Sequence, residues 1–235
     1  TAHLMFRDGP AALQQSAAPL SDRPLVALLG AFLPVPLAIG LGTLAGDAVG
    51  VVGKNLAYGT ASLLVLAGLA VVLDRPERRA VVPFERPGRE ELQWALLGFP
   101  VGTALYLGAT AATSAAGLTL GGYEYGLSDP VTVGAVVFGA VLVSPLAEEV
   151  LFRGLLLGSL LGRGWRPLVA GGAAIVAFGV LHLPLLGPAG VIAMSAWSVV
   201  PTVLRLRFDS LSGAWLVHQL NNLWAYLGVV ALGLG

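Results

Sequence analysis

The sequence predicts an all-α polytopic membrane protein, a bundle of about seven or eight transmembrane spans. Three observations predict this fold. Hydrophobic residues make up 56% of the 235 residues, charged residues make up 11%, and the mean hydropathy is +0.83. Soluble proteins average about 45–50% apolar and about 25% charged residues. Apolar runs close to the roughly 20 residues that cross a bilayer recur along the chain, and charged residues gather between them.

Charge and cysteine content exclude several classes of function. The formal net charge is zero, so the excess of Lys and Arg that nucleic-acid binding needs is absent, and we expect no nucleic-acid partner. The chain has no cysteine, which excludes disulfides and thiolate zinc sites. The expected partners are the lipid bilayer and a peptide or protein substrate within it.

The chain divides into a short tail and one membrane domain. Residues 1–23 mix charged residues with Ala, Gln, Ser and Pro, which predicts an extramembrane tail. Residues 24–235 are expected to form a single transmembrane domain, in which Pro34 and Pro36 kink the first span. The expected spans cover residues 24–42, 55–73, 93–117, 131–162, 168–186, 189–204 and 211–234.

The distribution of Lys and Arg predicts the topology. Residues 74–92 carry five arginines, so the positive-inside rule makes this loop cytoplasmic, whereas residues 118–130 carry no Lys or Arg and belong on the other side. Seven crossings then place the amino terminus in the cytoplasm and the carboxy terminus outside. We expect a prokaryotic plasma membrane.

The segment 131–162 is too long for a simple span, because one helix of this length would extend about 48 Å at 1.5 Å per residue. Either two short helices meet at Pro145, or one long helix bends there. The arginines at 163 and 166 favour one crossing, and therefore one bent helix with Glu148 and Glu149 at membrane depth.

Charged residues within this apolar segment are the first sign of a functional site. An ionised group inside a bilayer costs at least a few kcal/mol, so such residues usually face the protein interior and have a role. Glu149 and Arg153 are four residues apart, share a helix face and are expected to pair. Glu148 points elsewhere, has no cationic partner on its own helix, and is the candidate general base.

Two later stretches repeat this pattern of polar residues in an apolar run. His182 follows Phe178 by four residues near the end of one span, and His218 and Asn222 share a face of the last span. A glutamate and a histidine can deprotonate water, and a second histidine and an amide can stabilise an oxyanion. Glu148, His182, His218 and Asn222 are therefore the candidate catalytic residues for hydrolysis of an acyl bond.

Each polar residue taken alone has a structural explanation. A single histidine or asparagine in a membrane helix can serve only as a hydrogen-bond partner of another helix. Buried Glu, Arg and His also build proton relays, so a proton-coupled transporter is an alternative function. A non-catalytic membrane adaptor or immunity protein of the same fold is another.

The ordered motifs Glu148-Glu149-x-x-x-Arg153, Phe178-x-x-x-His182 and His218-x-x-x-Asn222 resemble the CAAX prenyl protease type II and bacteriocin-processing family of intramembrane endopeptidases. The resemblance covers about the last hundred residues and implies a catalytic core at about 131–235, with an intramembrane catalytic cavity among its helices. It implies that Glu148 activates water with the help of His182, and that His218 and Asn222 stabilise the oxyanion. Glu149, Arg153 and Phe178 would support the site. The implied substrates are membrane-associated proteins, of which prenylated CaaX proteins are one class.

The chain is expected to need no cofactor. Two His and two Glu are able to ligate zinc, which is the least unlikely metal, but no His-Glu-x-x-His pair occurs on one helix. A glutamate paired with an arginine is also a poor ligand. The residues therefore favour a metal-independent mechanism.

Overall fold

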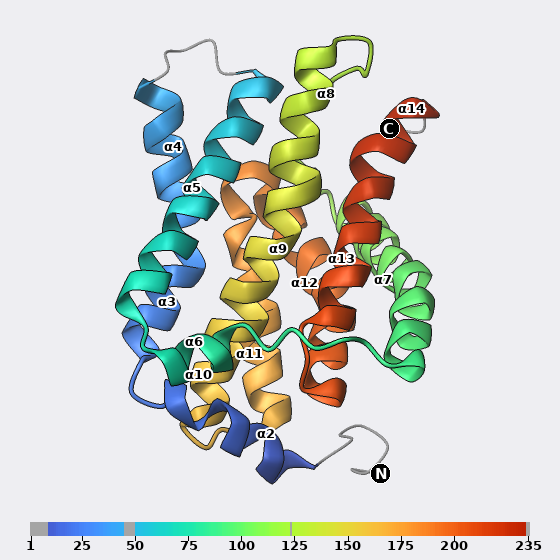
Figure 1. Ribbon diagram of the computed structural model, residues 1–235. Coiled ribbons are helices and arrows are strands. Elements are labelled where there is room, and N and C mark those ends of the chain that lie inside the picture. The colour runs from blue at the N-terminus through green and yellow to red at the C-terminus, as the bar shows by residue number, and fades with distance from the viewer. Residues whose placement is uncertain (1–8, 45–49, 123, 234–235) are drawn as a thin grey trace.

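The computed structural model describes residues 9–44, 50–122 and 124–233, and these residues form helices and connections without a β-strand (Figure 1). The first half of the chain contains α2 (Pro10–Ala17), η1 (Ala18–Leu20), α3 (Pro24–Phe32), α4 (Pro34–Leu44), α5 (Val51–Val72), α6 (Arg75–Val81) and α7 (Arg89–Ala115). The second half contains α8 (Pro130–Val136), η2 (Val137–Val143), α9 (Ser144–Glu148), η3 (Glu149–Leu156), α10 (Leu157–Gly162), α11 (Pro167–Leu181), α12 (Leu183–Phe208), α13 (Ser212–Leu223), η4 (Trp224–Gly228) and α14 (Val229–Ala231).

Each of the seven expected spans overlaps a helical segment, and the protein is an integral membrane protein; residue 234 of the last expected span lies outside the described residues. Five helices among the described residues are long and apolar enough to cross a membrane. They cover Pro24–Leu44, Val51–Val72, Arg89–Ala115, Pro130–Gly162 and Leu183–Phe208. The other two expected spans correspond to the shorter apolar helix α11 and to the segment from α13 to α14, which do not meet the same criteria of length and hydropathy.

The segment Pro130–Gly162 is one continuous helix of 33 residues, as the charge pattern predicted (Figure 1). It runs the length of the bundle from α8 to α10, and half of its most apolar window is buried, more than in the other spans. Two π-helical stretches, η2 and η3, flank Pro145. Such stretches are rare and occur often at functional sites, because they shift side chains and release backbone carbonyls.

Proline and glycine lie at junctions within two other spans. The helix α3 ends at Phe32 and α4 begins at Pro34, and Leu33 between them keeps helical dihedrals, so Pro24–Leu44 continues as one helical span. The kink expected at Pro34 and Pro36 stays a prediction. The chain leaves helical geometry at Gly187, whose φ of 68° favours glycine. This break separates His182, at the junction of α11 and α12, from the long remainder of α12.

Part of the predicted tail is an ordered short helix. The buried Leu13 and Ala17 of α2 pack against Leu157 and Leu161 of α10. Figure 1 shows α2, α6 and α10 at the same end of the bundle. The apolar spacing in residues 10–17 is too short to distinguish a packed helix from a tail by sequence alone.

An ion pair links the start of the first span to α6. Arg23 Nε donates to Glu77 Oε1 at 2.6 Å, and Glu77 also closes a capping box with Asp74. The hydrogen bond from Arg23 is the main reason that the pKa of Glu77 lies below its ordinary value. This contact therefore stabilises the fold above the ordinary pKa of a glutamate and is lost as the pH falls through the lowered pKa.

Candidate active site

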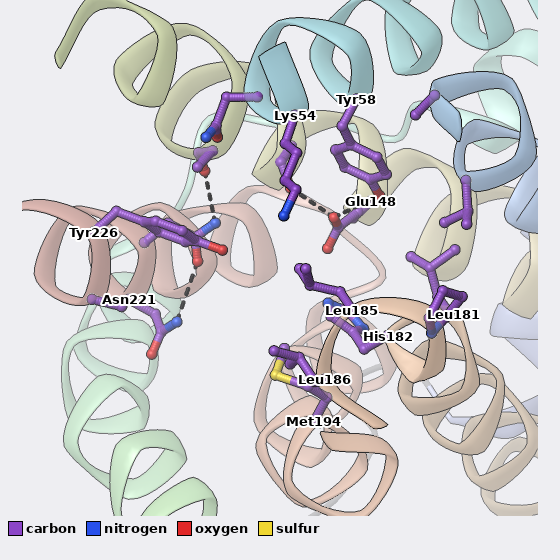
Figure 2. A pocket seen from close by; sticks show the side chains of 18 of the residues that line it. Lys54, Tyr58, Glu148, Leu181, His182, Leu185, Leu186, Met194, Asn221 and Tyr226 are labelled. Atoms are coloured by element: carbon purple, nitrogen blue, oxygen red, sulfur yellow. Dashed lines mark hydrogen bonds between the residues drawn. The ribbon is translucent and has the colours of Figure 1, made fainter. Parts of the chain in front are cut away.

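The four candidate catalytic side chains line one cavity. Its volume is about 870 Å³, and Glu148, His182, His218 and Asn222 all contribute to its wall. These residues come from three separate parts of the bundle, the central helix, the junction of α11 and α12, and α13. Figure 2 shows Glu148 and His182 facing each other across this space. Much of the remaining wall is apolar and includes Leu181, Leu185, Leu186, Met194, Trp197 and Val229.

Glu148 lies at the centre of the helix 130–162 with only 4% of its surface exposed. Its Oε1 accepts hydrogen bonds from Ser144 Oγ at 2.6 Å and from Tyr58 Oη at 2.9 Å. Its Oε2 lies 3.7 Å from His218 Nε2 and accepts no hydrogen bond from the described residues. One carboxylate oxygen is therefore held by two hydroxyl groups, whereas the other accepts no hydrogen bond from the described residues.

Glu149 and Arg153 form the expected ion pair behind the cavity wall. Arg153 Nη1 donates to Glu149 Oε1 at 3.0 Å, and both side chains are fully buried. Arg153 Nη2 also donates to Ser198 Oγ at 2.7 Å, and its Nε lies 3.4 Å from Thr202 Oγ1. The pair thus joins the central helix to α12, and neither member lines the cavity.

The ion pair also orients His218. Nδ1 of His218 lies 2.7 Å from Glu149 Oε1. A paired carboxylate only accepts hydrogen bonds, so the proton of the neutral imidazole belongs on Nδ1. Nε2 then faces Glu148, at 3.7 Å from its Oε2. Glu149 therefore does more than neutralise Arg153, which the sequence pattern did not reveal.

His182 presents a nitrogen to the cavity by a similar arrangement. Its Nδ1 lies 2.8 Å from the backbone oxygen of Phe178, and a carbonyl oxygen only accepts, so Nδ1 carries the proton of the neutral ring. Nε2 is then left as a proton acceptor. The spacing Phe178-x-x-x-His182 matters because a helix places the carbonyl of one residue beneath the side chain four positions later.

Phe178 is the aromatic centre of the site. Its ring centroid lies 4.8 Å from that of His182, 6.0 Å from that of His218 and 5.7 Å from that of Trp197. The guanidinium carbon of Arg153 lies 4.4 Å from the same ring centroid, within the range of a cation–π contact. Phe178 is fully buried and so fixes the relative positions of both histidines.

Asn222 is tied to the first π-helical stretch. Its Nδ2 donates to the backbone oxygen of Ala140 at 2.8 Å, and its neighbour Gln219 donates to that of Val141 at 2.7 Å. Both carbonyls belong to η2, so the amides of α13 bond to oxygens of the irregular helix. The amide of Asn222 has a second hydrogen, and this residue lines the cavity.

Several residues of the site could not be found by the sequence motifs. Tyr58 and Ser144 bind Glu148, whereas Ser198 and Thr202 bind Arg153. Trp197 packs on His218 with ring centroids 4.6 Å apart. Only Ser144 carried a local signal, because it precedes Glu148 by four residues on the same helix.

No group of three or more His, Cys, Asp or Glu side chains is placed to hold a metal ion in the part of the chain that the structure describes. The carboxylate of Glu149, which would be one of the four ligands, is engaged by Arg153 and His218. Metal independence stays a prediction.

A comparison with family models matches residues 130–224 to the description "Type II CAAX prenyl endopeptidase Rce1-like". This segment belongs to the Rce1-like family. It runs from the start of α8 to Trp224 and contains every motif on which the resemblance rested. The Rce1-like family groups CAAX-type membrane proteases. The match of this segment to that family agrees with a cavity that carries polar side chains among apolar helices. No curated protein and no solved structure matches the chain.

Proposed function

We propose that the protein is an intramembrane endopeptidase that hydrolyses peptide bonds of membrane-associated substrates with a water molecule activated by Glu148 and His182. The observation that carries this proposal is the convergence of Glu148, His182, His218 and Asn222 on one cavity. Separate helices supply these groups, and such convergence is expected of a reaction site rather than of isolated interhelical contacts.

The geometry supports an ordered role for each group. Oε2 of Glu148 removes a proton from water, and the oxygen of that water attacks the scissile carbonyl carbon. The carbonyl oxygen gains negative charge, which is stabilised by the amide of Asn222 and by Nε2–H of His218, whose ring is protonated on both nitrogens in this step. Collapse of the intermediate breaks the C–N bond, and the proton held by Glu148 passes to the leaving amine. His182 Nε2 accepts a hydrogen bond from the water and orients it.

The cavity wall supports a substrate class. The family description names prenylated CAAX substrates, and the wall of this cavity is rich in Leu, Met, Trp and Val side chains. We therefore propose that the substrate is an extended segment of a membrane-associated protein, with CaaX-type prenylated proteins as one class. A peptide bond at this site is shielded from bulk water, which strengthens each polar interaction with the transition state.

Orientation in the membrane follows from where the arginines lie. Figure 1 shows α6 and α10 at the same end of the bundle. Arg79 belongs to α6, Arg163 directly follows α10, and Arg207 belongs to the last turn of α12, which leads through residues 209–211 to a backbone hydrogen bond with Pro83, just after α6. We propose that this end faces the cytoplasm of a prokaryotic cell. The natural chain has no cysteine, so Arg79→Cys and Glu124→Cys provide two single labelling sites. A membrane-impermeant thiol reagent added to intact cells should label Glu124→Cys and spare Arg79→Cys, and the reverse pattern would contradict this orientation.

The proposed activity is tested with purified protein in lipid vesicles. Wild type should release a fragment from membrane-anchored peptides, whether prenylated or acylated, and His182→Ala should lose this activity while keeping its thermal stability. Vesicles loaded with a pH-sensitive dye report proton flux in the same preparation. Flux that depends on Glu148 in the absence of cleavage would replace the peptidase proposal with the transporter. Cellular function that survives both Glu148→Gln and His182→Ala would favour the adaptor.

A further inference from the structure

Tyr58 is the residue outside the Rce1-like segment that bonds directly to Glu148. It lies on α5, and its hydroxyl oxygen is 2.9 Å from Glu148 Oε1. The same carboxylate oxygen accepts from Ser144 at 2.6 Å. Figure 2 shows the Tyr58 ring and Glu148 joined at one side of the cavity.

The two donors make the carboxylate of Glu148 asymmetric. Oε1 accepts from two hydroxyl groups on two helices, so rotation of the carboxylate would break both bonds. Oε2 is consequently the oxygen that faces His218 Nε2 at 3.7 Å. A general base must hold its accepting lone pair within hydrogen-bond reach of the water, and loss of this geometry lowers the rate without affecting the peptide's contacts elsewhere.

Two glycines allow α5 to approach closely enough for this bond. A Cβ atom on Gly59 would lie 2.7 Å from the ring of Phe138 and 3.2 Å from the Cα of Gly139. A Cβ atom on Gly139 would overlap the backbone oxygen of Asn55. Small residues permit such close packing of membrane helices. The chain thus uses Gly59 and Gly139 to bring the hydroxyl of Tyr58 to Glu148.

We propose that Tyr58 is a positioning residue of the peptidase, which fixes Glu148 Oε1 and so directs Oε2 at the hydrolytic water. This inference rests on the proposed function and extends it to a residue of α5. Ser144 supplies the second bond from within the central helix. In this proposal the hydroxyl of Tyr58 bonds to Glu148 and not to the peptide. Its removal should therefore lower the rate of the chemical step and leave peptide binding unchanged.

The test compares Tyr58→Phe with Tyr106→Phe in vesicles. Both tyrosines line the cavity, but only Tyr58 bonds to Glu148, so Tyr106→Phe is the matched control. A hydrogen bond to a charged group contributes about 1.5–3 kcal/mol, so kcat of Tyr58→Phe should fall about 10- to 100-fold. KM and the melting temperature should stay unchanged, and any loss of kcat in Tyr106→Phe, which removes a hydroxyl from the same cavity wall, should be clearly smaller than the loss in Tyr58→Phe.

A double-mutant cycle separates positioning from other roles. In a Glu148→Asp background the carboxylate is withdrawn by one methylene, so Tyr58→Phe should cause less than a threefold further loss. An equal loss in both backgrounds, or a rise in KM with kcat unchanged, would overturn the inference. If wild type cleaves peptides and Glu148→Gln does not, while Tyr58→Phe is fully active, only this inference fails. If wild type cleaves no peptide, the proposed function itself fails.

Discussion

Removal of Arg153 should destabilise the protein far more than neutralisation of Glu148. Arg153 donates to Glu149, Ser198 and Thr202 and lies on the ring of Phe178, with none of its surface exposed. Arg153→Met keeps the approximate length of the side chain but leaves the carboxylate of Glu149 buried without its cation. Removal of one partner of a buried ion pair costs about 3–5 kcal/mol.

The expected change in melting temperature follows from the size of the chain. For 150–250 residues, 1 kcal/mol corresponds to about 2–4 °C, so Arg153→Met should melt roughly 6–20 °C below wild type. Tryptophan fluorescence of the detergent-solubilised protein measures this change. Glu148→Gln keeps an oxygen for Ser144 and Tyr58 to bond, so its melting temperature should differ from that of wild type by no more than about 3 °C.

A second substitution tests whether stranded charge is the cause. Arg153→Met combined with Glu149→Gln removes both charges and keeps an oxygen that accepts from His218 Nδ1. The double variant should recover at least half of the lost stability and remain inactive. A single variant Arg153→Met as stable as wild type would refute the buried pair, and a double variant no more stable than the single one would refute the charge argument.

Three further predictions concern other contacts. Asn222→Ala leaves the backbone oxygen of Ala140 without its donor, so the free energy of unfolding should fall by about 1–3 kcal/mol and peptide cleavage should be lost. Thermal melts and cleavage assays measure both effects, and Asn221→Ala should cause a smaller loss in each. Gly139→Ala should separate α5 from the central helix and lower kcat at least as much as Tyr58→Phe, and a fully active Gly139→Ala would contradict the close packing. Arg23→Gln should lower the melting temperature at pH 7, where Glu77 is ionised, and this effect should shrink as the pH falls through the lowered pKa of Glu77, where the pair is lost; an effect that stays equally large throughout an acid titration of the melting temperature would contradict the ion pair.

Helical periodicity and local spacing predicted much of this molecule. The seven apolar segments, the single long helix 130–162 and the Glu149–Arg153 pair all depend on interactions within about four residues or on hydropathy over about 20 residues. The hydrogen bonds to the first π-helical stretch were not predicted, because the amides of Gln219 and Asn222 reach the carbonyls of η2 from α13, far along the chain. The ordered helix α2 was also not predicted, because its two buried residues are buried by packing against α10, which lies far away in the sequence.

Residues that act across helices were the hardest to predict. The hydroxyl of Tyr58 reaches Glu148 from 90 positions away, and His218 reaches Glu149 from 69 positions away. A tyrosine in an apolar run is an ordinary residue of a membrane helix, so nothing in the sequence around Tyr58 distinguishes it from Tyr106. The close approach of α5 to η2 decides which tyrosine meets the carboxylate.

The rate of peptide cleavage by Glu148→Gln, relative to wild type in the same vesicles, tests the central claim most directly. A general base contributes about 10²–10⁴ in rate, so the variant should be slower by at least a factor of about 100 while its melting temperature is preserved. A folded Glu148→Gln protein that cleaves the peptide as fast as wild type would contradict the account.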